Sequence, residues 1–415
     1  MTRVLPVVVA LVVCGLVVSS CGAGGGTSTT AIQSTPAPPP ARPAFGITED
    51  NADLLWAPGA AAPAAAAPFA QARGWLSALR PRYFRLLVDW AALQPSPSAP
   101  ANLSAPVDGC ARGVGPCGAY AGVAGELEAI ASQQRAARAR GEAAPQVVVD
   151  LLGAPSWATL GPHGCEAAGA EPAARALSPA ALPFYRRLIS DLLALGRREG
   201  VELAWWAPWN EPNDPRFLTP QRASCAKDGA PLAPSSYAEL ARAAAAELKA
   251  PGGGGQLLLG ELGGYGTGSP HRLSVAEFVA ALPQDVLCLS RDWSVHAYAA
   301  FGPGASRGGE PVAALEQALD ERGGCARGAR IWVSEAGAGA ARPGRPRSGS
   351  GSEQRAGATA LAAQLERWSA DPRVAAVFQY SFREDPSYPV GLAEASLAHL
   401  YETYSVWGSF AHHTP

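Results

Sequence analysis

The chain of 415 residues carries no excess charge of either sign, since 33 Lys and Arg residues balance 35 Asp and Glu residues. No run of basic residues stands out, which argues against nucleic acid as a partner. The charged fraction is low, at 16%, whereas 48% of the residues are hydrophobic and 11 are Trp. This composition supplies enough apolar surface for a sizeable core, so it excludes disorder over the whole chain.

Two motifs that would indicate a metal or a nucleotide cofactor are also missing. The sequence has no Cys-x-x-Cys pair, and the spacing of its cysteines argues against a zinc site. The first apolar segment runs into GITEDN, residues 46–51, which is not a Gly-rich turn of the kind that binds phosphate. We therefore expect neither a cofactor nor a metal.

Residues 1–20 are predicted to be an export signal. Arg3 supplies a positive start, and residues 4–18 form an apolar run that is short for a membrane span. Small residues then lead into Cys21, an order that resembles a bacterial lipoprotein signal and implies a lipid on Cys21. The alternative is an ordinary secretory signal with an incidental cysteine. Both interpretations predict export, and the first places the protein on the outer face of the cell membrane.

Residues 21–43 are predicted to be a flexible linker. They are rich in Gly, Ser and Thr, with a Pro cluster at the far end, and have almost nothing to bury. A tether of this kind suits a lipid anchor better than a freely secreted protein. No further break in composition follows, so residues 44–415 are predicted to form a single domain.

Short apolar runs alternate with longer amphipathic segments throughout this domain. The expected strands are residues 44–48, 83–88, 146–152, 202–207, 256–260, 293–298, 330–334 and 374–380. The clearest helix spans residues 178–200, with Ser178 as N-cap, Pro179 in the first turn and Gly200 past the end. Eight strand–helix units predict an α/β protein that closes as a single (β/α)8 TIM barrel, and the alternative is a doubly wound open sheet.

Two glutamates follow expected strands that face one another across such a barrel. Glu211 comes after the fourth strand in WAPWNEPN, residues 206–213, and Glu335 comes after the seventh in RIWVSEAG, residues 330–337. Side chains at the carboxyl ends of barrel strands meet at one mouth. Alternation puts Ile331, Val333 and Glu335 on one side of their strand. If Ile331 and Val333 fill the barrel, Glu335 points into the mouth above them. The alternative is that each Glu caps a helix or pairs with an Arg.

The two motifs together resemble clan A of the glycoside hydrolases, and the strand count extends the resemblance over the chain from about residue 44. It implies that Glu211 is the acid/base, that Glu335 is the nucleophile and that Asn210 binds the sugar 2-hydroxyl. Many members of the clan carry a Trp at strand eight, where this sequence has Phe378 and Tyr380. This departure leaves the family within the clan, and therefore the sugar, open.

The proposed chemistry explains why two carboxyl groups are needed. Hydrolysis with retention uses one carboxylate to attack the anomeric carbon and one carboxylic acid to protonate the leaving oxygen, about 5–5.5 Å apart. A separation of about 6.5–9.5 Å would admit a water molecule and give inversion. Two carboxylates so close do not easily both ionise, so one keeps a proton and can serve as the acid.

Three further residues are expected at this site. Arg85 lies within an apolar strand, where a guanidinium is costly unless paired, and the resemblance implies that it keeps the nucleophile ionised. The alternative is a pair with Asp89 or Asp150. His296 and Tyr298 point the same way, and the resemblance places the Tyr hydroxyl on the nucleophile and the His near the substrate or the acid/base. A core histidine bound to the backbone is the alternative for His296.

Other side chains are predicted to contact the substrate. Trp157 and Trp209 follow strands three and four, where an indole can stack on a sugar ring, although Trp is also an ordinary core residue. Gln379 closes strand eight and is expected at the rim. Glu49 and Glu261, after strands one and five, are equally suited to bind sugar hydroxyls or to be solvated helix caps.

Six cysteines remain in the body once Cys14 in the signal and Cys21 are set aside. An even number in an exported chain predicts three disulfides, and sequence alone allows fifteen pairings. The barrel reduces the number of plausible pairings. Cys165 and Cys225 lie in loops at the mouth, Cys288 and Cys325 precede strands at the opposite end, and Cys110 and Cys117 bracket one short loop. The expected pairs are Cys165–Cys225, Cys288–Cys325 and Cys110–Cys117.

The sequence therefore predicts a retaining glycosidase that cleaves O-glycosidic bonds of a β-linked glycan or glycoside. It is expected to act as a monomer on a carbohydrate substrate and to contact the membrane only through its lipid anchor. A non-catalytic carbohydrate-binding lipoprotein on the same barrel is the first alternative, since a fold does not determine function. A surface adhesion or scaffold protein is the second, and it would present a flat apolar patch instead of a cleft.

Overall fold

The computed structural model describes residues 42–63, 66–226, 228–299, 310–339, 347 and 351–412. The predicted signal, Cys21 and nearly all of the predicted linker lie outside these residues.

Parallel strands form one sheet that closes on itself. They are β1 (Ala44–Thr48), β2 (Tyr83–Asp89), β3 (Gln146–Leu152), β4 (Leu203–Ala207), β5 (Gln256–Leu257), β6 (Leu259–Gly263), β7 (Asp292–His296), β8 (Arg330–Ala336) and β9 (Val374–Tyr380). Their order is β5-β4-β3-β2-β1-β9-β8-β7-β6. Only Leu258 separates β5 from β6, and its N–H donates to the Trp206 carbonyl at 2.9 Å, so the two segments act as one barrel strand. The predicted (β/α)8 barrel is confirmed.

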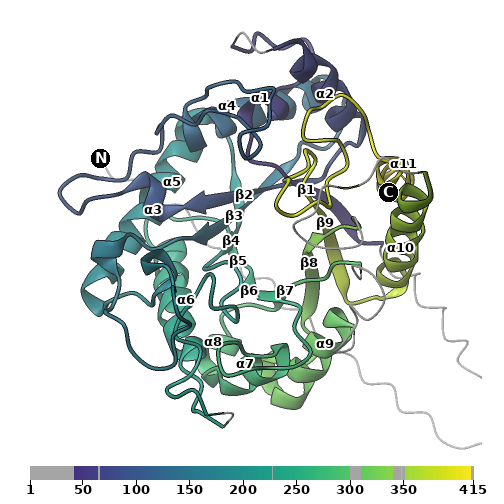
Figure 1. The fold of residues 1–415 in the computed structure, drawn as a ribbon. Coiled ribbons are helices and arrows are strands. Elements are labelled where there is room, and N and C mark those ends of the chain that lie inside the picture. The colour runs from purple at the N-terminus through teal and green to yellow at the C-terminus, as the bar shows by residue number, and fades with distance from the viewer. Residues whose placement is uncertain are drawn as a thin grey trace, which may run out of the picture. The chain divides into compact units, whose positions relative to one another are not determined.

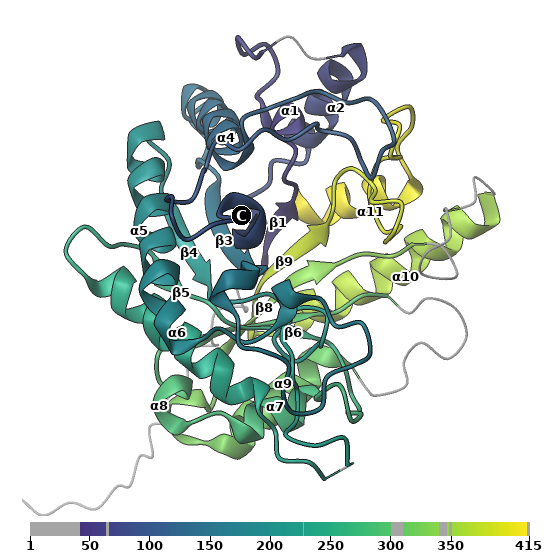
Figure 2. The same ribbon diagram turned by 60° about the vertical axis from the view of Figure 1, so that its left-hand side comes forward.

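Helices follow the strands and surround the barrel (Figure 1). They are α1 (Ala52–Leu55), α2 (Ala67–Ala78), α3 (Trp90–Leu93), α4 (Gly122–Ala139), α5 (Leu182–Glu199), α6 (Ala233–Lys249), α7 (Val275–Ala281), α8 (Gln284–Leu287), α9 (Pro311–Arg322), α10 (Gly351–Ala370) and α11 (Glu402–Ala411). Figure 2 shows the same ring from the side, with α5 and α6 packed next to each other. Among the described residues, none of the helices is both long and apolar enough to cross a membrane.

The predicted helix over residues 178–200 begins differently from the expectation. Pro179–Ala181 forms a 3₁₀ turn before α5, and the side chain of Ser178 makes no capping hydrogen bond. The end is as expected, because Gly200 adopts the left-handed conformation, at φ 69°, that closes the helix.

A cluster of aromatic residues fills the barrel below its mouth. Trp332 lies at its centre, with ring centroids 4.5 Å from Trp205, 5.1 Å from Tyr83 and 6.0 Å from Phe378. A Cβ at Gly46 would collide with the Phe378 ring, so this position of β1 accepts no side chain. The aromatic cluster closes the barrel and gives the polar residues above it a solid floor.

The six body cysteines form three disulfides, Cys110–Cys117, Cys165–Cys225 and Cys288–Cys325. These are the pairs expected from the positions of their loops in the barrel. Disulfides of this number are consistent with an exported protein.

Candidate active site

Glu211 and Glu335 lie together at the mouth of the barrel. Glu335 belongs to β8, and Glu211 follows β4. One carboxylate oxygen of each, together with a ring nitrogen of His296, forms a group whose atoms all lie within 4.8 Å of one another. All three residues line a cleft of about 1250 Å³. The carboxyl groups therefore face a common space that is large enough for a ligand.

Glu335 reaches the mouth by a route that strand alternation does not predict. Ile331 and Val333 pack in the core outside the barrel, whereas Trp332 fills its interior. Strict alternation would then turn Glu335 outward. The register of β8 shifts between Val333 and Ala336 against β9, and this irregularity turns the Glu335 side chain into the cleft. The condition that Ile331 and Val333 fill the barrel is thus not met, yet Glu335 does point into its mouth.

Glu211 is held in an uncommon backbone conformation, with φ at 35°. The segment after it is anchored by Asn213, whose side chain exchanges two hydrogen bonds of 2.8 Å with the backbone of Gly263 at the end of β6. A residue in a strained backbone conformation persists only where surrounding contacts hold it there. The anchor on β6 supplies such contacts and fixes Glu211 relative to the next barrel strand.

Arg85 connects the cleft to the buried carboxylates beneath it. The guanidinium is completely buried, and it donates to Glu335 at 2.9 Å, Asp150 at 2.7 Å and Glu261 at 2.8 Å. It also donates to the Asn210 side-chain oxygen at 3.1 Å. Arg85 therefore contacts Glu335, as the resemblance implies, and also pairs with Asp150, though not with Asp89.

The charges beneath the cleft shift one another's protonation. Burial raises the pKa of Asp150 well above its usual range despite the charge of Arg85. Burial would also raise the pKa of Glu261, but Arg85 and a hydrogen bond from His296 hold it down at about 2. Glu261 is therefore a buried anion between two cations, and neither a sugar ligand nor a solvated cap.

His296 lies between the carboxylates of the site. Its Nδ1 is 2.9 Å from Oε1 of Glu211 and 3.1 Å from Oε2 of Glu335, and its Nε2 is 2.8 Å from Oε2 of Glu261. Burial alone would lower the pKa of His296. The charge of Glu335 and the hydrogen bonds to Glu211 and Glu261 outweigh burial and raise this pKa to about 10. The ring is therefore an imidazolium at neutral pH, and not a neutral histidine bound to the backbone.

Tyr298 completes the contacts of Glu335. Its hydroxyl donates to Oε2 of Glu335 at 2.5 Å, and its ring packs edge-on against Tyr388 with centroids 4.8 Å apart. Tyr380, whose centroid lies 6.4 Å from that of Tyr298, lines the same cleft. β7 ends at His296, so Tyr298 continues the alternation of β7 beyond its last ladder residue.

Three residues predicted to bind substrate are engaged elsewhere. Trp157 donates its indole N–H to the Gln94 carbonyl at 3.0 Å and is not among the described residues that line the cleft. Trp209 is 1% exposed and donates to the Phe217 carbonyl at 2.7 Å. Gln379 is completely buried and donates to the Val390 carbonyl at 2.7 Å. Both Trp residues follow the core interpretation, and Gln379 does not lie at the rim.

A further group of polar residues at the cleft was not predicted from the sequence. Arg216 donates to Glu211 at 3.3 Å, to Asp214 at 2.9 Å and to the Tyr265 hydroxyl at 3.2 Å. Tyr265 in turn donates to Asp214 at 2.5 Å. Asp214 and Arg216 follow the Glu-Pro pair closely in the chain, which could have drawn attention to them, but Tyr265 comes from a loop with no distinctive motif.

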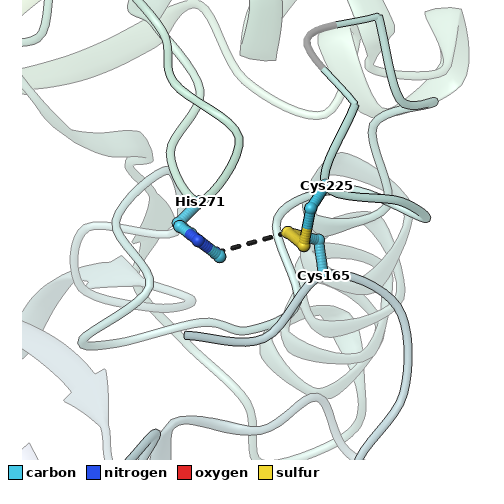
Figure 3. A group of neighbouring side chains, drawn as sticks. All are labelled: Cys165, Cys225 and His271. Carbon is cyan, nitrogen blue, oxygen red and sulfur yellow. Dashed lines mark hydrogen bonds between the residues drawn. A yellow bond between two sulfur atoms is a disulfide. The ribbon is translucent and has the colours of Figure 1, made fainter. Parts of the chain in front are cut away.

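Two clusters of metal-ligating residue types occur among the described residues, and neither fits a metal as it stands. In the first, His271 Nδ1 lies 3.3 Å from Sγ of Cys165. Figure 3 shows the His271 ring beside the Cys165–Cys225 disulfide. The sulfurs of Cys165 and Cys225 are joined in a disulfide and are not the thiolates that bind zinc. The second is Glu211, His296 and Glu335, in which both ring nitrogens of His296 are already engaged, Nδ1 by the two glutamates and Nε2 by Glu261.

Solved structures with the same fold are glycoside hydrolases in several cases. The chain is similar to the GH53 catalytic domain from Ignisphaera aggregans, with a TM-score of 0.50 and 13% identity over 90% of this chain and 97% of that one. It is also similar to the catalytic domain of GH30 xylanase C from Talaromyces cellulolyticus, with a TM-score of 0.50 and 12% identity over 90% of this chain and 76% of that one. A third similar structure is SrfJ from Salmonella typhimurium, with a TM-score of 0.54 and 11% identity over 90% of this chain and 75% of that one. No protein-family model and no curated protein matches the sequence.

Proposed function

We propose that this protein is a retaining glycoside hydrolase that cleaves the O-glycosidic bond of a β-linked glycan or glycoside by double displacement. Glu335 is the nucleophile and Glu211 is the acid/base. The observation that carries this proposal is the approach of their carboxylate oxygens to within 4.8 Å in one cleft. This separation supports the retaining geometry, since an inverting site leaves about 6.5–9.5 Å for a water molecule between its carboxyl groups.

The first step joins the substrate to the enzyme. An oxygen of Glu335 attacks the anomeric carbon while the bond from that carbon to the leaving oxygen breaks, and Glu211 gives its proton to that oxygen. In the second step Glu211 takes a proton from water, and the resulting hydroxide displaces Glu335 from the anomeric carbon. The sugar leaves with its original anomeric configuration, and both glutamates return to their starting states.

The surroundings of Glu335 suit a nucleophile. The Arg85 guanidinium and the Tyr298 hydroxyl donate to its two different oxygens, at 2.9 and 2.5 Å. These two hydrogen bonds hold the carboxyl group in one orientation, as a nucleophile requires. Asn210, whose oxygen accepts from Arg85, has its amide nitrogen left for a sugar hydroxyl.

Two neighbours position Glu211 for proton transfer to the leaving oxygen. Nδ1 of His296 lies 2.9 Å from one oxygen of Glu211 and holds the carboxyl group at the cleft. Arg216, which is 65% exposed, contacts the other oxygen of Glu211 at the edge of the cleft. A substrate that enters the cleft can displace this exposed guanidinium at little cost, because exposed ion pairs contribute only weakly.

The first experiment is a screen of aryl glycosides followed by trapping on any that is hydrolysed. A substrate with fluorine at C2 and a good leaving group slows the second step, so the covalent intermediate accumulates and the protein mass rises by that of one sugar. The expected attachment is to Glu335, located by peptide mass spectrometry. Release of the opposite anomer, observed by NMR, would reject double displacement. Binding of glycans without hydrolysis of any panel member would favour the carbohydrate-binding alternative.

A further inference from the structure

One wall of the cleft is built by the loop between β6 and α7. Gly264, Tyr265, Gly266, Thr267 and Arg272 of this loop line the cleft together with the two glutamates. The loop is fixed at both ends, because Val275 N–H donates to the Tyr265 carbonyl at 3.0 Å and Asn213 donates to the Leu273 carbonyl at 3.2 Å. Its side chains are therefore held in place before any ligand arrives.

Arg272 lies flat against an aromatic ring in this wall. Its guanidinium carbon is 4.0 Å from the centroid of Tyr265, a distance typical of cation–π stacking. The Tyr265 hydroxyl is itself fixed by Asp214 at 2.5 Å and by Arg216 at 3.2 Å. The stack orients the planar guanidinium and leaves its edge free to bind.

The charge of Arg272 is not neutralised by the residues that the structure describes. Of the other arginines that line the cleft, Arg216 is paired with Asp214 at 2.9 Å and Arg112 with Asp385 at 3.3 Å, whereas Arg367 is exposed and has no ion pair among the described residues. No ion pair or side-chain hydrogen bond joins the Arg272 guanidinium to another described residue, and its Nε is buried without a partner. A partly buried cation without a counter-ion is costly, and an anion in the cleft would offset its charge.

A chain of side-chain contacts links this wall of the cleft to the proposed acid/base. Arg272 stacks on Tyr265, the Tyr265 hydroxyl contacts Arg216, and Arg216 contacts Glu211 at 3.3 Å. A sugar bound against this wall is therefore close enough to Glu211 to belong to the same saccharide chain as the cleaved bond.

We propose that Arg272 binds the carboxylate of a uronic acid residue, so that the substrate is an acidic saccharide. The planar edge of a guanidinium matches a carboxylate with two parallel hydrogen bonds, which favours a carboxylate over a neutral hydroxymethyl group. This inference rests on the proposed function, because it takes the cleft to be a saccharide site.

The test measures binding and does not depend on turnover. Acidic oligosaccharides from glucuronoxylan, pectin, alginate and hyaluronan are compared with the same oligosaccharides after chemical reduction of their carboxyl groups. Isothermal titration calorimetry is performed on the full-length protein carrying Glu335→Gln, which prevents hydrolysis. At least one acidic oligosaccharide is expected to bind about tenfold or more tightly than its reduced form, the scale of a hydrogen bond to a charged group.

Three further variants in the same background test whether the preference for acidic ligands depends on Arg272. Arg272→Gln should abolish it by weakening only the acidic ligand, and Arg272→Lys should retain it in part. Arg367→Gln, which removes another cleft-lining arginine without an ion pair among the described residues, should leave the preference within about twofold. Equal loss in both Gln variants, a preference that survives Arg272→Gln, or no acidic binder in the panel would each overturn the proposal.

Failure of this inference is distinguishable from failure of the proposed function. Hydrolysis of neutral aryl glycosides with no preference for acidic ligands would reject the role of Arg272 alone. Preferential binding of acidic ligands, without hydrolysis of any glycoside by the unmodified protein, would reject the glycosidase activity and support carboxylate binding by Arg272.

Discussion

Nδ1 of His296 lies 2.9 Å from an oxygen of Glu211 and 3.1 Å from an oxygen of Glu335, so a single nitrogen contacts both carboxyl groups of the candidate site. The opposite nitrogen of the ring contacts Glu261, which is completely buried. The ring thus lies beside the group proposed to protonate the leaving oxygen, and three carboxylates hold the ring in position.

Replacement of Glu335 removes the proposed nucleophile. Glu335→Ala should lower kcat by a factor on the order of 10⁴ or more, because it removes the carboxylate that is proposed to attack the anomeric carbon. Initial rates on an aryl glycoside measure this loss. Glu239→Ala, an exposed glutamate on α6, is the matched control and should leave the rate unchanged. Retention of most activity in Glu335→Ala would reject its role.

Replacement of Glu211 should depend on the leaving group. In Glu211→Ala the rate should fall by roughly 10²–10⁴ for substrates whose leaving groups need a proton, and far less for activated aryl glycosides. A series of aryl glycosides of graded phenol pKa measures this dependence. Equal losses across the series would count against general acid catalysis by Glu211.

Substitution of Tyr298 tests its hydrogen bond to the proposed nucleophile, Glu335. Tyr298→Phe deletes one hydrogen bond to a charged oxygen and should lower kcat by about tenfold or more with little change in KM. Tyr404→Phe deletes a hydroxyl that donates to the Trp75 carbonyl on the outside of the barrel, and it should leave kcat unaltered. A similar effect of both variants on kcat would indicate a general structural role.

Arg85 should matter as much for folding as for chemistry. Arg85→Met leaves Glu335, Asp150 and Glu261 without their shared cation in a buried site, and we expect a loss of about 3–5 kcal/mol in the free energy of unfolding. Urea denaturation measures this loss. Arg187→Met removes an exposed arginine paired with Asp191 and should change stability by less than about 1 kcal/mol. A small effect for Arg85→Met would show that the carboxylates are protonated or hydrated instead of paired.

His296 should make stability depend on pH in the alkaline range. Its pKa in the folded protein is raised from 6.5 to about 10, so the folded state binds more protons than the unfolded state between these values. The stabilisation by His296 is therefore complete below pH 6.5 and is lost as the pH rises through about 10. The difference in unfolding free energy between the wild type and His296→Gln should shrink over this range. A difference that stays constant from pH 6 to 10 would show that the ring is neutral.

The sequence determined where the strands lie, because a strand buried on both faces must be apolar along its length. Residues 44–48, 146–152 and 374–380 were predicted with the bounds that β1, β3 and β9 have. The same reasoning placed Arg85, His296 and Tyr298 in the barrel, since period-two alternation fixes the side of a strand that a residue occupies. It also brought Glu211 and Glu335 to the same mouth.

Only the tertiary structure decided where side chains point once the strands end or become irregular. Glu335 is turned inward by a register shift, and Glu211 and Glu261 have φ values of 35° and 50° that break the alternation. Trp209 is directed into the core by a hydrogen bond to a carbonyl eight residues away.

Contacts between separate loops, such as that of Arg272 with Tyr265, depend on how each loop folds over the mouth. No repeating pattern in the sequence encodes such contacts, because loops have no fixed period. The strands thus follow from the sequence, and the shape and charge of the cleft follow from the loops that the barrel positions.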